Sequence, residues 1–243
     1  MNSATLLLWA ALALAPVPER AAPPAPFVSR FGITDNSFLV EEAFNQEKGI
    51  FQNIFAVTRS HSGDWSGSFT QEWPIKGQRH QFSYTVPFSR VGGANDIGDV
   101  MVNYRLQVAG GEPGTTSFSP RVSWSRSAWQ VNLPVSHEAG RLFVHANAGN
   151  TWADDDSTPF VAGSAIVAVR PMLNVMLEVY NEWRPSASGR DRATIVSPGL
   201  RGGWDIGDAQ LVLGVAAPIT RGAVRDHGVL LYFSYELPFT KNR

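Results

Sequence analysis

The chain has 243 residues, with 20 Lys and Arg against 21 Asp and Glu, so its formal net charge is −1. Because binding to phosphate backbones needs a surplus of basic side chains, this balance argues against a nucleic-acid partner. The sequence holds no cysteine, which excludes disulfides, thiolate metal sites and cysteine nucleophiles. Its 22 glycines and 16 prolines disfavour a helix-rich chain, so the composition predicts a β protein.

The first apolar segment is the run Leu6–Ala15, LLLWAALALA, which a Pro- and Ala-rich stretch follows. As a helix this run would reach only about 15 Å, half the thickness of a bilayer core. Its length fits the apolar region of a signal peptide, although residues 1–5 hold no Lys or Arg. We therefore expect a signal peptide over residues 1–22. An apolar N-terminal helix of a cytoplasmic protein is the alternative.

Residues 23–49 form a Pro-rich lead-in, and its last part, Ser37–Lys48, reads SFLVEEAFNQEK. Ser37 suits a helix N-cap, the two adjacent glutamates suit the first turn, and Gly49 suits a stop. We expect a short helix or a plug-like segment here, ahead of the first strand. An unstructured lead-in is the alternative.

Apolar and polar residues alternate from Ile50 onward. Val102 and Tyr104 share one parity, for example, whereas Asn103 and Arg105 share the other. Period two is typical of β-strands, because successive side chains leave opposite faces of the pleat. The pattern predicts about twelve strands. They lie near residues 50–60, 65–73, 79–88, 97–108, 117–124, 128–136, 141–152, 160–170, 173–184, 192–204, 208–219 and 228–238.

Three features favour a membrane barrel over a soluble β-sandwich, which is the alternative. The predicted strands cover more than half of the chain, far above the share usual in a globular domain. Their typical length of about ten residues suits a tilted strand that crosses a bilayer. Aromatic residues gather near strand ends, where membrane barrels carry interface girdles. We therefore expect an all-β, twelve-stranded antiparallel transmembrane barrel over residues 50–239, with a C-terminal extension at 240–243.

The expected connections differ between the two ends of this barrel. Turns on the near side, such as residues 171–172 and 205–207, are short. Far-side connections at Ser89–Asp96, Ala153–Pro159 and Pro185–Asp191 are longer and more polar. Short turns at one end and longer loops at the other are typical of outer-membrane barrels.

Strand parity divides the side chains between the lumen and the outer surface. The lumen-lining candidates are Arg79, Asn103, Arg105, Arg121, Gln130, Asn132, His145, Asn147, Arg170, Glu178 and Glu236. The lipid-facing or interface aromatics are Trp73, Tyr104, Trp124, Trp129, Phe233 and Tyr235. The mixed charges of the lumen either pair across it and close it or set a field across a narrow channel.

Several stretches resemble a group of uncharacterised proteobacterial outer-membrane β-barrels that are labelled as transporters. The group is similar to the proposed outer-membrane channels of meta-pathway phenol degradation. The resemblance covers nearly the whole mature chain and implies a barrel and a transport role, without a substrate. The matching stretches are DNSFLVEEAFNQE at Asp35–Glu47, SFTQEW at Ser68–Trp73, HQFSYTVP at His80–Pro87, GDVMVNYR at Gly98–Arg105, QVNLPVS at Gln130–Ser136 and YELPF at Tyr235–Phe239.

Motifs for catalysis or cofactor binding are weak in this sequence. We find no phosphate loop, metal triad or cofactor fingerprint, and expect no cofactor, no metal and no catalytic residue. Asp154–Asp156 is an alternative divalent-cation site, and a solvated loop is the simpler interpretation. His145 is the alternative catalytic base of an outer-membrane lipid hydrolase, and a polar lumen residue is the simpler interpretation.

The leading hypothesis is a passive channel of the bacterial outer membrane for small, aromatic or apolar, solutes. Loops or the Ser37–Lys48 segment would gate its polar lumen. A closed structural or surface-interaction barrel is the second hypothesis, and an outer-membrane hydrolase is the third. The expected partners are outer-membrane lipid, the barrel assembly machinery and a small-molecule solute.

Overall fold

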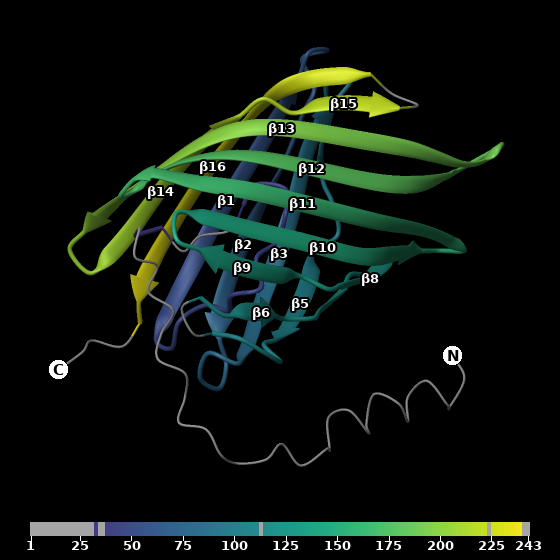
Figure 1. Ribbon diagram of the computed structural model, residues 1–243. Helices are drawn as coiled ribbons and strands as arrows, with labels where there is room; N and C mark the ends of the chain where they lie inside the picture. The colour runs from purple at the N-terminus through teal and green to yellow at the C-terminus, as the bar shows by residue number, and fades with distance from the viewer. Residues whose placement is uncertain (1–31, 34–36, 112–113, 223–224, 240–243) are drawn as a thin grey trace, which may run out of the picture.

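The computed structural model describes residues 32–33, 37–111, 114–222 and 225–239 (Figure 1). The expected signal peptide and the C-terminal extension at 240–243 lie outside the described residues. The strands are β1 (Ile50–Ser60), β2 (Trp65–Pro74), β3 (His80–Val91), β4 (Ala94–Ile97), β5 (Met101–Leu106), β6 (Thr116–Phe118), β7 (Arg121–Trp124), β8 (Ala128–Asn132), β9 (Val135–Ala139), β10 (Leu142–Ala153), β11 (Asp156–Arg170), β12 (Leu173–Ser186), β13 (Gly189–Ile206), β14 (Ala209–Ala216), β15 (Ile219–Gly222) and β16 (Asp226–Pro238).

These segments make twelve antiparallel strands, because β4/β5, β6/β7, β8/β9 and β14/β15 are each one interrupted strand. Pro120, Pro134 and Pro218 lie in three of the four interruptions, where a residue without an N–H cannot donate to the ladder. β1 pairs with β16 from Ile50↔Pro238 to Ser60↔Gly228 and closes the barrel. The predicted all-β, twelve-stranded barrel is therefore confirmed. No helix long and apolar enough to cross a membrane occurs among the described residues.

Strand parity in the barrel follows the alternation of the sequence. On β5, the side chains of Val102 and Tyr104 are exposed on the outer surface, whereas Asn103 and Arg105 are buried in the lumen. The same alternation holds along β12, where Leu177 is exposed and its neighbour Glu178 is buried.

Aromatic side chains gather on the outer surface at two levels. Trp129 on β8 and Trp152 on β10 are opposite each other, and their rings stack at 3.8 Å. Trp73 packs against Phe82 and Tyr84 near the other end of the barrel. The six candidate aromatics Trp73, Tyr104, Trp124, Trp129, Phe233 and Tyr235 all belong to the outward-facing parity of their strands.

The two ends of the barrel differ in the connections that they hold. The turn end holds the β2–β3, β9–β10, β11–β12 and β13–β14 connections, and the hairpin end holds the β1–β2, β3–β4, β10–β11 and β12–β13 connections. The prediction of long polar loops at the hairpin end is wrong. The strands continue through those residues and meet in tight turns, such as Gly92–Gly93 with φ of 58° and 88°.

The inner wall is mostly polar and carries an apolar patch. Polar side chains line β3, β5, β7, β8, β9 and β10, including Gln81, Asn103 and Ser136. On β14 and β16, Val212, Ala216, Leu230 and Tyr232 form the apolar patch with Ile33. A segment inside this barrel therefore meets hydrogen-bonding groups on one side and an apolar surface on the other.

Candidate functional site: the occluded lumen

Residues Ser37–Glu47, called the plug below, lie inside the barrel. The predicted helix over Ser37–Lys48 is wrong, because the segment has an irregular backbone, and the plug-like alternative describes it. A helix keeps its backbone hydrogen bonds within the segment. The lumen instead offers polar side chains to the backbone groups of the plug, and these groups need partners because they are buried.

Side chains of the barrel wall hold the plug backbone. One carboxylate oxygen of Glu178 accepts from the N–H groups of Leu39 and Val40, at 2.8 and 3.1 Å. Asn147 accepts from the Glu41 N–H and donates to the Glu41 C=O, each at 2.8 Å. Further contacts run from the Ala43 N–H to Ser136 Oγ at 2.8 Å, from the Gln46 N–H to Gln81 Oε1 at 2.6 Å and from Ser119 Oγ to the Ala43 C=O at 2.5 Å.

The order of these contacts shows that the plug is a re-entrant loop. Before it, the Gly32 C=O accepts from Gln210, close to the β13–β14 turn. Its tip then reaches Glu178 in the middle of β12. Asn45 lies back at the turn end, where its amide donates to the Arg79 C=O at 2.9 Å. The chain therefore enters the lumen from the turn end and returns to the same end to begin β1.

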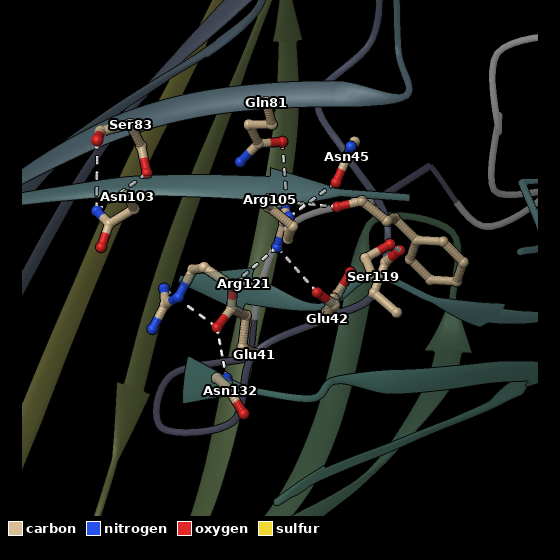
Figure 2. Close-up of polar contacts among 12 residues, drawn as sticks. Glu41, Glu42, Asn45, Gln81, Ser83, Asn103, Arg105, Ser119, Arg121 and Asn132 are labelled. Atoms are coloured by element: carbon tan, nitrogen blue, oxygen red, sulfur yellow. Dashed lines mark hydrogen bonds and ion pairs between the residues drawn. The ribbon is translucent and has the colours of Figure 1, made fainter. Parts of the chain in front are cut away.

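Arg105 is the strongest anchor of the plug on the polar wall (Figure 2). Its side chain is 3% exposed. All three nitrogens of its guanidinium donate hydrogen bonds, and most of the acceptors belong to the plug. The acceptors are Asn45 Oδ1 at 2.8 Å, Glu41 Oε1 at 3.1 Å, the Glu42 C=O at 2.9 Å, the Phe44 C=O at 2.6 Å and Gln81 Oε1 at 2.9 Å.

Glu41 bridges two arginines that the barrel places opposite each other. Arg105 on β5 and Arg121 on β7 are directly paired in the sheet, and both face the lumen. Glu41 Oε1 contacts Arg105 and Oε2 contacts Arg121, each at 3.1 Å. Asn132, the partner of Arg121 on β8, donates to the same Oε2 at 2.6 Å. Like charges directly opposite in a sheet repel, so this carboxylate relieves a repulsion built into the wall.

Glu42 faces two other side chains of the lumen, His145 and Arg201. Its Oε1 lies 3.7 Å from His145 Nε2 and 3.8 Å from Arg201 Nη2, and all three side chains are buried. The other ring nitrogen of His145 lies 2.7 Å from Ser136 Oγ. Ser136 and His145 are opposite each other on β9 and β10. Ser136, His145 and the Glu42 carboxylate thus follow one another at contact distance. The Ser136 hydroxyl also accepts a hydrogen bond from the Ala43 N–H of the plug.

A cavity of about 280 Å³ lies on the hairpin side of the plug tip. Arg121, Gln130, Asn132 and Asn147 line its polar side. Phe38, Ile54, Phe160, Tyr180 and Tyr232 line its apolar side. The rings of Phe160 and Tyr180 stack at 5.6 Å, and those of Phe38 and Tyr232 lie 5.0 Å apart.

A much smaller cavity of about 20 Å³ lies on the other side of the plug, between it and β1–β3. Glu47, Glu72, Gln78 and Glu236 are among its lining residues. A volume of this size holds about one water molecule. Burial raises the pKa of the Glu47 carboxyl, so Glu47 keeps its proton to a higher pH than an exposed glutamate. The plug therefore separates an open cavity at the hairpin end from a nearly filled turn end.

The structure places most of the lumen candidates together around the plug. Asn103, Arg105, Arg121, Gln130, Asn132, His145, Asn147, Glu178 and Glu236 face the lumen. Arg79 and Arg170 do not line it: Arg79 lies in the β2–β3 turn, Arg170 ends β11, and both side chains are exposed. Asp154–Asp156 forms the tight turn of the β10–β11 hairpin and the first residue of β11. No metal-binding group of three or more side chains occurs among the described residues.

Sequence reasoning missed the partners of the plug at Gln81, Ser136 and Arg201. Each lies on the inward parity of its strand, so the alternation itself could have found them. It also missed the role of Glu41 and Glu42, which were assigned to a helical first turn. Their partners are more than 60 positions away along the chain, and period-two alternation carries no information on such contacts.

No protein-family model matches this sequence, and no curated protein matches it. Among solved structures, the barrel is similar to the COG4313 outer membrane channel from Pseudomonas putida F1. That similarity has a TM-score of 0.57 at 10% identity and covers 79% of this chain and 95% of that chain. The outer-membrane-expressed OmpT of Vibrio cholerae matches with a TM-score of 0.42 at 6% identity, over 80% of this chain and 100% of that chain. The first similarity shows that this chain shares the fold of an outer-membrane channel.

Proposed function

We propose that this protein is a passive outer-membrane channel for small solutes, closed here by its plug. One observation carries the proposal: side chains of the wall hold the plug, while the barrel closes through its own β1–β16 ladder. The plug can therefore leave the lumen without breaking a strand pair of the barrel. Transport would be diffusion through the polar lumen, without coupling to an energy source.

The outer surface supports the placement in a membrane. Exposed aliphatic residues such as Val144, Val175 and Leu177 lie on the outward faces of the strands, and aromatic residues gather toward both ends of the barrel, as in barrels that span the outer membrane. We therefore propose outer-membrane lipid and the barrel assembly machinery as partners, and export through the expected signal peptide.

Conductance in planar lipid bilayers tests the channel. The double variant Glu41→Gln/Glu42→Gln removes both carboxylates that face the lumen arginines, and we expect it to stay open longer than the wild type. Glu182→Gln is the matched control, because it removes a carboxylate whose partner Arg184 is exposed at the hairpin end. Heat-modifiable gel mobility confirms that each variant forms a barrel. A folded double variant without conductance would rule out the channel and leave the closed structural barrel.

Lipid hydrolysis is the second candidate function, and the contact between Ser136 and His145 favours it. Both side chains are buried in the lumen, so only a substrate inside the barrel could reach them once the plug has moved. A lipid-hydrolysis assay with wild type, Ser136→Ala and His145→Ala tests this candidate. We expect the three proteins to be equally inactive. Activity that both substitutions abolish would favour the enzyme.

A further inference from the structure

The strongest electrostatic feature of the lumen is the pair formed by Arg105 and Arg121. Their backbones are directly paired on β5 and β7, both side chains point inward, and a carboxylate is needed between them. The plug supplies this carboxylate through Glu41, whose two oxygens contact one arginine each. The amide of Asn132 completes the group. Arginine forks and an amide donor together match the geometry of a carboxylate.

We infer that Arg105, Arg121 and Asn132 form a carboxylate-binding site of the wall, in which Glu41 of the plug takes the place of a solute. When the plug leaves, the two arginines still face each other and still require an anion. A solute that carries a carboxylate supplies it and so stabilises the open lumen. This inference deepens the proposed function, because the site lies in the conduction path.

The cavity beside Glu41 indicates what the rest of the solute looks like. Arg121 and Asn132 line it together with the rings of Phe160, Tyr180 and Tyr232. A molecule whose carboxylate lies at the arginines would therefore place its body against aromatic rings. While Phe38 and other plug residues still line it, this cavity of about 280 Å³ has room for a single ring and not for a long chain. The inferred solute class is a small aromatic carboxylate.

The other acidic residues of the lumen do not contact the two arginines of this site in the same way. Glu178 on β12 accepts from the plug backbone, and Glu72 on β2 lines the 280 Å³ cavity but accepts from Gln81 at 2.7 Å. Glu236 lines the small cavity at the turn end. The anion site is therefore local to β5, β7 and β8, and the inference concerns binding at this place.

Isothermal titration calorimetry of the folded, full-length protein in detergent tests the inference with three probes. Benzoate carries both the ring and the carboxylate, benzyl alcohol carries the ring alone, and acetate carries the carboxylate alone. We expect benzoate to bind at least about tenfold more tightly than either of the others, because only benzoate uses both halves of the site. Equal affinities for benzoate and benzyl alcohol would overturn the inference.

Two variants distinguish an effect on the carboxylate site from an effect on the folding of the barrel. Arg121→Gln should weaken benzoate binding by about tenfold, since a charged hydrogen-bond donor is lost. Glu41→Gln should tighten it several-fold, because the competing carboxylate of the plug is gone, and misfolding cannot mimic a gain. Glu182→Gln serves as the control and should bind benzoate as the wild type does. Unchanged or weaker binding by Glu41→Gln would contradict competition with the plug.

Binding and conduction distinguish the two proposals. If benzoate binds as expected but the folded Glu41→Gln/Glu42→Gln variant does not conduct, the carboxylate site is supported and the channel is overturned. Conductance with no preference for benzoate in the calorimeter supports the channel and overturns the carboxylate site.

Discussion

Arg105 of β5 and Glu41 of the plug form a buried ion pair of 3.1 Å between residues 64 positions apart in the chain. The same guanidinium accounts for hydrogen bonds to three further plug residues. The apolar patch of the wall contributes differently, through packing around Phe38 and Leu39. The plug is thus attached on two sides by two kinds of force, and each can be weakened by a single substitution.

Arg105→Met should release the plug from the polar wall. The substitution keeps an unbranched apolar stem but leaves the C=O groups of Glu42 and Phe44 without the Arg105 donor, which favours a hydrated, withdrawn plug. Limited digestion with a glutamate-specific protease measures the release, because Glu41 and Glu42 become accessible outside the lumen. We expect cleavage in Arg105→Met and resistance in the wild type. Arg184→Met, which removes an exposed arginine at the hairpin end, is the control, and equal resistance of all three would contradict the anchoring role.

Gly214→Val should displace the plug without changing any charge. Gly214 on β14 has no side chain at the point where the ring of Phe38 lies, and a Cβ there would collide with the ring. The ring must move, and we expect a larger open fraction in planar bilayers. Gly163→Ala is the control, because a Cβ at Gly163 lies at an ordinary 3.6 Å from its nearest neighbour, the His145 C=O. If Gly214→Val conducts no more than Gly163→Ala, the apolar contact does not hold the plug.

Arg substitutions on the outer surface test the membrane assignment. Val102 and Leu177 are exposed on the outside of β5 and β12. If they contact lipid near the midplane, Val102→Arg and Leu177→Arg should each lower the free energy of unfolding by about 2–4 kcal/mol. Ile97→Arg, beside Phe88 at the hairpin end, should cost only about 0–1 kcal/mol. Urea unfolding in lipid vesicles measures all three, and equal costs would mean that the lipid boundary lies elsewhere.

The strands and their faces were predictable from the sequence because alternation is local. Val102 and Asn103 are neighbours, and their contrast alone is enough to assign one to the outer surface and the other to the lumen. The predicted and observed strands agree over most of their length. The differences arise where Pro120, Pro134 and Pro218 interrupt the ladder, and at the hairpin end, where the strands extend through the residues predicted as loops.

The plug was predictable as an interruption of the pattern, and its conformation was not. Helix signals at Ser37, Glu41 and Glu42 are local preferences worth about 1 kcal/mol each or less. The lumen offers those residues ion pairs and hydrogen bonds with Arg105, Arg121 and Ser164 instead. These partners meet the plug only once the barrel has closed, so a single sequence does not reveal them.

The stacked pair of Trp129 and Trp152 should stabilise the barrel at the hairpin-end girdle. Their rings are 3.8 Å apart and nearly parallel, at 9°, and such pairs contribute about 0.5–1.5 kcal/mol beyond the area they bury. A double-mutant cycle of Trp129→Ala and Trp152→Ala, measured by urea unfolding in lipid vesicles, should give a coupling of that size. Trp73 lies near the opposite end of the barrel, so a cycle of Trp73→Ala with Trp152→Ala should be additive within about 0.3–0.5 kcal/mol. Equal coupling in the two cycles would mean that each tryptophan contributes through the membrane interface alone and that the stacking adds nothing.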